Sequence, residues 1–154
     1  MPHGEAIMTT ERYRMLIRQG LEALQQNDTL LAMVLFEDAC KLADTPTAKS
    51  CLAYCLAREK KQFQKAVAMC LSAQQKEPNN SLHYLNLGRT YLAAGQKLKA
   101  IRALRKGLKM ERNQQIIDLL IQLGQRKPPP IPALPREHFL NRNLGRLLTR
   151  MGMR

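Results

Sequence analysis

Small residues recur in this chain at an interval of 34 positions, and this period constrains the fold more than any other feature of the sequence. Two sets of small residues follow the interval without error: Ala32, Ala66 and Ala100, and Ala39, Ala73 and Gly107. A repeat of this length is one supersecondary unit, which buries its apolar face only by stacking on the next unit. The period therefore predicts a solenoid of three units, at residues 13–46, 47–80 and 81–114.

Each unit is expected to consist of two helices joined by a short break. In the third unit, apolar residues keep helical spacing on both sides of residues 94–96, which include a glycine. The corresponding breaks in the first two units are residues 26–28 and 60–62. Residues 44–46 and 78–80 end these units, and they contain the Asn, Asp and Thr residues that commonly cap helices.

The small and aromatic residues of these units resemble the pattern of the tetratricopeptide repeat (TPR) family. The residues that match the family pattern are Gly20, Ala32, Phe36, Ala39, Ala66, Ala73, Pro78, Tyr84, Gly88, Tyr91 and Ala100. Tyr54, Asp44 and Arg112 depart from it, so the match is not uniform along the repeats. The resemblance covers residues 13–114 and implies an all-α fold, a right-handed TPR superhelix of three helix-turn-helix repeats.

Segments on both sides of the repeats complete the predicted organisation. Residues 1–12 are an N-terminal extension, and residues 115–126 continue the helical apolar pattern as a capping helix that closes the TPR domain of residues 13–126. Residues 127–154 form a Pro-rich linker and an amphipathic tail. Residues 128–135 contain five prolines, which exclude a helix and favour an extended segment.

The tail is expected to form a short amphipathic helix that begins near Asn141. Its apolar residues are Phe139, Leu140, Leu144, Leu147, Leu148 and Met151, and Arg142, Arg146 and Arg150 occupy the other side. A lone helix of this length is marginal in water. We therefore expect this face to dock on TPR helices of the same chain, or on those of a second copy in a homodimer. The alternative is a tail reserved for a membrane or another protein.

Charge is distributed unevenly along the chain, which carries a formal net charge of +13. Residues 1–46 have four basic and seven acidic side chains, whereas residues 81–114 have eight basic and one acidic. A basic stripe is predicted on the convex face of the last repeat, formed by Lys99, Arg102, Arg105, Lys106 and Lys109. Two interpretations stay open: a solvated face that favours solubility, or an anionic contact with phosphate or lipid.

The resemblance implies that first-helix positions line a concave groove. These positions hold Arg14, Ile17, Leu21, Leu24, Cys51, Cys55, Arg58, Leu82, Leu85, Arg89 and Leu92. A solvated groove without a ligand is not expected to be mainly apolar, so we expect a peptide there, oriented by the arginines. TPR domains that clamp the C-terminal carboxylate of heat-shock chaperones use polar residues where this chain has Ile17, Leu21, Leu52 and Leu82. That role is therefore disfavoured.

Nothing in the sequence indicates catalysis. His3, His83 and His138 lie in separate regions, and there is neither a phosphate-binding loop nor a nucleophile elbow. Cys51 and Cys55 are one helical turn apart, but no second pair supplies the remaining ligands of a zinc site. We expect four reduced cysteines packed as small apolar residues, no cofactor, no metal and no small-molecule substrate.

The function predicted from these features is a non-catalytic adaptor that binds a protein or peptide partner. A cytoplasmic location is expected, because the sequence shows neither a secretory signal nor a membrane-spanning segment. One alternative is a type III secretion translocator chaperone, which is similar in size and repeat number but is not expected to be basic or to have a Pro-rich tail. The other is a binder of nucleic acid or membrane lipid through the basic stripe.

Overall fold

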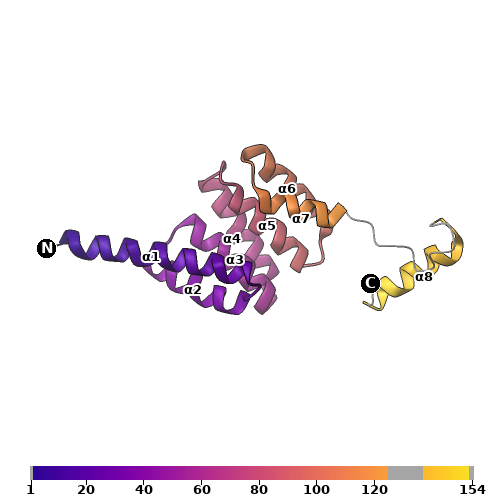
Figure 1. Ribbon diagram of the computed structural model, residues 1–154, viewed down its shortest axis with the longest axis horizontal. Coiled ribbons are helices and arrows are strands. Elements are labelled where there is room, and N and C mark those ends of the chain that lie inside the picture. The colour runs from indigo at the N-terminus through magenta and orange to yellow at the C-terminus, as the bar shows by residue number, and fades with distance from the viewer. Residues whose placement is uncertain (1, 125–136, 153–154) are drawn as a thin grey trace. The chain divides into compact units, whose positions relative to one another are not determined.

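The computed structural model describes residues 2–124 and 137–152, and every regular element in these two ranges is an α-helix. The helices, labelled in Figure 1, are α1 (Pro2–Gln25), α2 (Thr29–Leu42), α3 (Pro46–Lys60), α4 (Phe63–Lys76), α5 (Ser81–Ala93), α6 (Lys97–Met110), α7 (Gln114–Gly124) and α8 (Phe139–Arg150). The chain divides into two compact units, Met1–Leu120 and Ile121–Arg154. The predicted extended segment at residues 128–135 lies outside the described residues.

In the compact unit Met1–Leu120, the two helices of each repeat are separated at the predicted breaks, residues 26–28, 60–62 and 94–96. Side chains at the starts of helices satisfy free backbone N–H groups, as helix caps do. Asp28 accepts a hydrogen bond from the Leu31 N–H at 3.0 Å, and Thr45 accepts one from the Ala48 N–H at 3.1 Å. Pro46 was predicted to end the first repeat, but it is the first residue of α3. The first N–H groups of a helix have no partner within the helix, so the N–H that proline lacks costs no hydrogen bond there.

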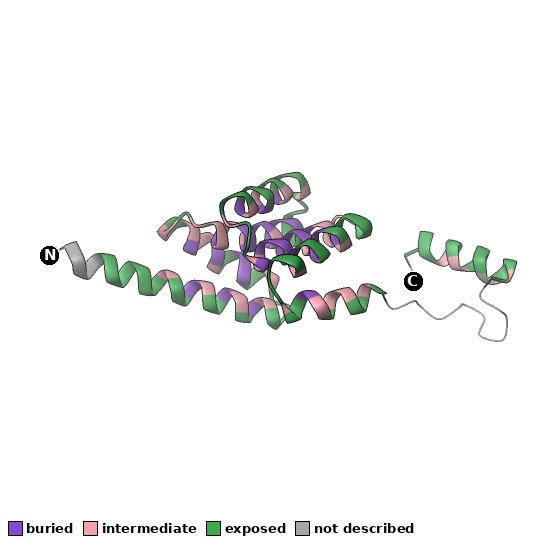
Figure 2. Ribbon diagram, turned by 90° about the horizontal axis from the view of Figure 1, so that it is seen from above, coloured by how far each residue is buried: buried purple, intermediate pink, exposed green. Residues whose placement is uncertain are grey.

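Helix α1 extends well beyond the repeat that it opens. It contains 24 residues, whereas its partner α2 contains 14. The additional turns come from the N-terminal extension, which continues α1 as helix from Pro2. Ile7 and Met8 in these turns are 59% and 71% exposed, and Figure 2 shows this part of α1 projecting past the neighbouring helices.

The recurring small residues lie where helices approach most closely. Ala32, Ala66 and Ala100 are fully buried, and a Cβ added at Gly20 would lie 2.5 Å from Cε1 of the Phe36 ring. At Gly20 and Gly88, the side chains of Phe36 and Leu104 on the facing helices occupy the space that the missing side chain leaves. These small residues therefore mark positions where paired helices cross closely.

The capping helix α7 packs against the last repeat through the same kind of contact. Ile116 is fully buried, and a Cβ added at Gly107 on α6 would lie 2.9 Å from Ile116 Cδ1 and 2.6 Å from Tyr84 Cβ. Asn113 caps α7 by accepting a hydrogen bond from the Ile116 N–H at 3.3 Å. Gly107 is therefore the point at which α5, α6 and α7 meet.

A chain of polar side chains joins the second repeat to the third. Ser50 on α3 and His83 on α5 are buried, with Ser50 Oγ 2.9 Å from His83 Nδ1. His83 Nε2 lies 2.8 Å from the Glu77 carboxylate, and Asn86 donates to Ser50 Oγ at 3.2 Å. Helices α3 and α5 carry most of the buried residues of their repeats (Figure 2), so these bonds set the register of the helices at the centre of the core.

We expect Gly107→Ala to destabilise the protein although alanine favours helix formation. The added methyl group would overlap Tyr84 and Ile116, and relieving that overlap should lower the free energy of unfolding by roughly 1–3 kcal/mol. Urea denaturation followed by circular dichroism measures the change. Gly124→Ala is the matched control, since no atom lies within 4 Å of its added Cβ. Equal stability of Gly107→Ala and wild type would contradict the close contact.

The Glu77 carboxylate should make the stability of the protein sensitive to acid. Hydrogen bonds from His83 and then Asn80 lower the pKa of Glu77 from its ordinary value of 4.5. The stabilisation is therefore complete above about pH 4.5 and is lost as the pH falls through the lowered native pKa. The difference in unfolding free energy between wild type and Glu77→Gln should shrink over that range. A difference independent of pH would show that this carboxylate is not linked to folding.

Candidate peptide-binding surface

The residues predicted to line the groove fall into three groups by burial. Half-buried apolar residues are Ile17, Leu21, Leu24, Leu82 and Leu92. The arginines are exposed at Arg14 and Arg58 and half-buried at Arg89, whereas Cys51, Cys55 and Leu85 are fully buried. Only the first two groups can contact a ligand from solvent.

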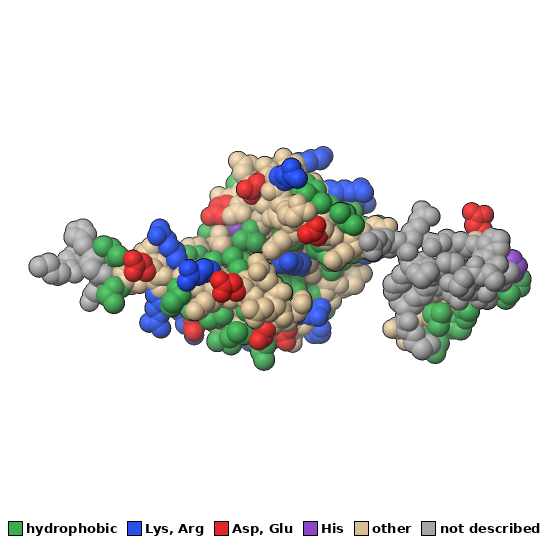
Figure 3. Space-filling model, in the orientation of Figure 1, with side chains coloured by type: hydrophobic (Ala, Val, Ile, Leu, Met, Phe, Trp, Pro, Cys, Tyr) green, Lys and Arg blue, Asp and Glu red, His purple; other side chains and the backbone are tan. Residues whose placement is uncertain are grey.

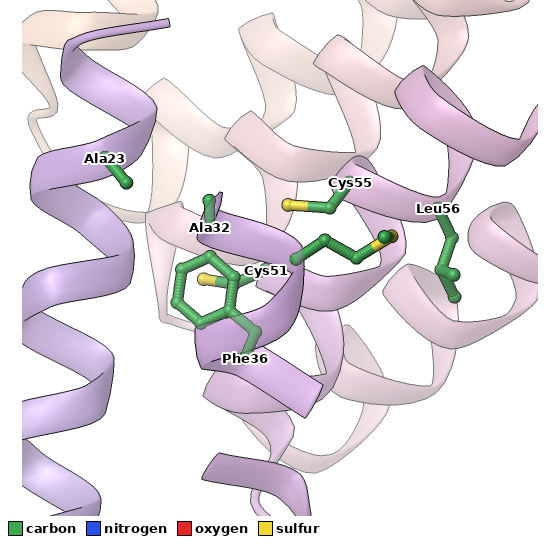
Figure 4. Close-up of a cluster of buried hydrophobic side chains, with 7 residues drawn as sticks. Ala23, Ala32, Phe36, Cys51, Cys55 and Leu56 are labelled. Atoms are coloured by element: carbon green, nitrogen blue, oxygen red, sulfur yellow. The ribbon is translucent and has the colours of Figure 1, made fainter. Parts of the chain in front are cut away.

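The prediction that Cys51, Cys55 and Leu85 line the groove is wrong. Each is 0% exposed, and Figure 4 shows both cysteines within a cluster that includes Ala23, Ala32 and Phe36 from the first repeat. The first repeat therefore covers the part of α3 that the family pattern assigns to the groove. Burial raises the pKa of the Cys51 and Cys55 thiols to about 12, so both stay protonated and unreactive.

A hollow of about 620 Å³ lies along α1. Its lining residues are Tyr13, Arg14, Ile17, Arg18, Leu21, Glu22, Gln25 and Thr47. It includes three of the predicted groove residues, and it adds Thr47 from the start of α3. Tyr13 is held beside that end of α3 by a 2.5 Å hydrogen bond between its hydroxyl and that of Thr45. No local sequence signal identifies this pairing, because the two residues are 32 positions apart.

Half-buried aliphatic side chains extend this apolar surface from α1 to α3 and α5. Five of them pack on the core cluster around Phe36: Ile17, Leu21, Leu24, Leu52 and Leu82. Their inner atoms contact the core, and part of each side chain stays accessible. Such a surface retains apolar area that a ligand can bury.

Arg89 differs from the two exposed arginines of the predicted groove in its surroundings. Its guanidinium carbon lies 5.5 Å from the centre of the Tyr54 ring, a cation–π geometry that joins α5 to α3. Burial lowers the pKa of Arg89 below its usual 12.5, but an arginine stays charged at neutral pH. Within the described residues, no carboxylate forms an ion pair with it. A half-buried cation of this kind favours an anionic group supplied by a ligand.

The residues of the basic stripe lie on the outer side of α6. Its five residues are exposed, whereas Ala100, Ala103 and Leu104 on the other side of the helix are buried. Lys99 and Lys106 lie 5.8 and 5.7 Å from the ring centres of Tyr91 and Tyr84. Figure 3 shows basic side chains at the edge of the molecule that α6 occupies. No ion pair between described residues neutralises the stripe.

The tail helix α8 begins at Phe139, two residues before the predicted start. The earlier start follows from a cap, because His138 Nδ1 accepts a hydrogen bond from the Leu140 N–H at 3.4 Å. Phe139, Leu140, Leu144, Leu147 and Met151 are exposed, and Leu148 is half-buried. Docking of this face on the repeats stays a prediction.

The Glu77–His83–Ser50 chain has the order of groups found in hydrolase triads, and no sequence pattern predicted it. Ser50 and His83 are both fully buried, so no substrate can reach the Ser50 hydroxyl oxygen. Ser50 also donates to the Thr47 carbonyl at 3.2 Å and accepts from Asn86. Its hydrogen bonds are those of a structural joint between repeats.

In the described parts of the chain, no group of three His, Cys, Asp or Glu residues is arranged to hold a metal ion. No helix in those parts combines the length and the apolar character needed to cross a bilayer.

Comparison with solved structures gives consistent matches, although no protein-family model and no curated protein sequence matches the chain. The Arabidopsis OM64 TPR domain matches with a TM-score of 0.55 and 21% identity, over 75% of this chain and 96% of that domain. The first TPR domain of human RPAP3 matches with a TM-score of 0.55 and 18% identity, over 73% and 90%. The first TPR of Spaghetti (RPAP3), bound to the HSP90 peptide SRMEEVD, matches with a TM-score of 0.55 and 18% identity, over 75% and 94%.

The likeness to these TPR domains covers about three quarters of the chain. Small residues at the crossings, paired helices and a final helix on the last repeat are all present. The predicted all-α fold is confirmed: the chain has the tetratricopeptide repeat fold, with three repeats and a capping helix.

Proposed function

We propose that this protein is a non-catalytic adaptor that holds a peptide segment of another protein on the surface formed by α1, α3 and α5. The hollow along α1 carries the proposal, because half-buried aliphatic side chains and charged residues line it together. Ligand pockets commonly combine an apolar lining with a few polar groups that orient the ligand.

The arginines differ in what they contribute to such binding. Arg14 and Arg58 are exposed, so water and salt screen their attraction for a ligand. Arg89 is half-buried beside Tyr54, where a charge–charge contact is screened less. We therefore infer a peptide with large apolar side chains and an acidic residue that pairs with Arg89.

The Spaghetti structure holds an acidic HSP90 peptide, but the surface of this chain differs in character. Ile17, Leu21 and Leu82 provide apolar contact where polar side chains were expected for a carboxylate clamp. We infer that apolar burial supplies most of the affinity here and that the acidic contact sets orientation. The type III secretion chaperone role has no specific support in these features.

We also infer that the protein has no catalytic activity and acts in the cytoplasm. The hydroxyl–imidazole–carboxylate chain is inaccessible, which supports the first inference. The four cysteines are free thiols, and three of them are buried in the core, which is typical of proteins from reducing compartments.

The peptide surface can be tested with a phage-displayed library selected on the wild-type protein. Leu21→Glu should weaken binding of the selected peptides at least about ten-fold, the effect of losing roughly 1.4 kcal/mol of contact energy. Arg89→Gln should weaken the binding only of those selected peptides that contain an acidic residue. Isothermal titration calorimetry measures both effects.

Leu98→Glu is the control for this experiment, because Leu98 is 73% exposed on α6 and lies outside the proposed surface. Circular dichroism and thermal melting establish that each variant is folded. Selected peptides that bind Leu21→Glu and wild type equally, or a library that yields no binders, would contradict the proposed function.

A second candidate function, contact with a polyanion, is favoured by the five cations of the basic stripe, none of which forms an ion pair with another described residue. If the stripe binds phosphates, affinity for single-stranded DNA should fall steeply as salt is raised. Replacing the five residues by Gln should abolish that binding in fluorescence anisotropy titrations. Binding that does not respond to salt, or none at low salt, would leave the stripe as a solvated face.

A further inference from the structure

Helix α8 separates apolar and basic side chains onto different sides. Leu140, Leu144, Leu147 and Met151 are between 37% and 60% exposed and recur at helical spacing. Figure 3 shows hydrophobic side chains on the surface of this helix. Its three arginines, at positions 142, 146 and 150, are exposed and follow one another at intervals of four. The helix therefore presents an apolar face and a cationic face at the same time.

The helix carries no acidic residue, and it is poorly suited to stand alone in water. Residues 138–152 contain neither Asp nor Glu, so no internal ion pair offsets the arginines. It has 12 residues and contains Gly145, which lowers helix stability by about 1 kcal/mol relative to alanine. A helix this short needs a surface that covers its apolar face.

The two candidate surfaces of the repeats are a poor electrostatic match for this helix. The basic stripe on α6 and the candidate peptide surface with Arg14, Arg58 and Arg89 both carry positive charge. Half-buried Glu37 and Asp38 on α2 are already paired with Lys60 and Lys41. A second copy presents the same charges. Docking on either of these two surfaces would therefore bring arginines near other cations, which is unfavourable.

An anionic lipid bilayer matches both faces together. Its interface has negatively charged headgroups directly above an apolar layer, and amphipathic helices with Lys or Arg on one face and Leu or Phe on the other lie in that plane. A helix of 12 residues is about 18 Å long, well short of the roughly 30 Å hydrocarbon core, so it cannot span the membrane. Long arginine side chains reach the headgroups while their stems stay in apolar surroundings.

We propose that α8 is an interfacial anchor that attaches this protein to membranes rich in anionic phospholipid. Leu140, Leu144 and Leu147 enter the acyl boundary, and the arginines contact lipid phosphates. The inference does not depend on the peptide-binding function, because it rests on a helix in the other compact unit of the chain.

Cosedimentation of the full-length protein with vesicles tests the anchor. We expect binding to vesicles of phosphatidylglycerol and phosphatidylcholine, and little binding to phosphatidylcholine alone. Replacing Arg142, Arg146 and Arg150 by Gln should weaken binding roughly 100-fold, since each arginine near an anionic surface accounts for about a five-fold change. Leu144→Glu should abolish measurable binding, because it puts a charge in the apolar face.

The matched control replaces all five residues of the basic stripe by Gln. This variant loses more positive charge than the tail variant, so retained vesicle binding would show that α8 acts specifically and not through net charge. Loss of binding in the stripe variant, with binding retained in Leu144→Glu, would overturn the proposal. Absence of binding to anionic vesicles at low salt would overturn it as well.

Two measurements without vesicles test the competing occupants of the apolar face. A lower melting temperature of the repeats in Leu144→Glu would indicate that α8 packs on its own chain. Conversion of a dimer to a monomer in the same variant, measured by light scattering, would indicate exchange between copies. Either result would overturn the assignment of this face to lipid, whereas an unchanged melting temperature and mass would support it.

Discussion

Close contact between small residues and large side chains of the facing helix is the constraint on which this fold depends. Gly20 lies against Phe36, Gly88 against Leu104, and Gly107 against Tyr84 and Ile116. Helices can approach this closely only where a side chain is missing. The contact occurs in the first and third repeats, and side chains from the first helices of all three repeats pack on one apolar cluster.

Polar contacts within this packed array then determine where charge is available for binding. The hydrogen bonds of Ser50, His83 and Asn86 hold α3 against α5. The same pair of helices places Arg89 over the Tyr54 ring, with its charge half-buried and without an acidic partner among the described residues. An arginine in such a position interacts more strongly with a ligand than the exposed Arg14 and Arg58 can.

The two basic helices of the chain differ in the physical basis for binding. On α6, the five cations lie on the outer side of the helix, opposite the buried Ala100, Ala103 and Leu104, so the stripe itself offers electrostatic attraction. On α8, exposed leucines accompany the arginines, so apolar burial and charge act together. Charge alone is screened by salt, whereas a combination of both forces favours an interface between water and hydrocarbon.

The repeat period and the helix breaks were predicted from the sequence alone, because spacing along the chain reports them directly. Arg14, Ile17 and Leu21, which the family resemblance assigned to a groove, line a hollow along α1. The burial of Cys51, Cys55 and Leu85, the Glu77–His83–Ser50 chain and the Arg89–Tyr54 contact required the tertiary structure. Each depends on residues from another helix, and helical periodicity reports which residues share a face but not what covers that face.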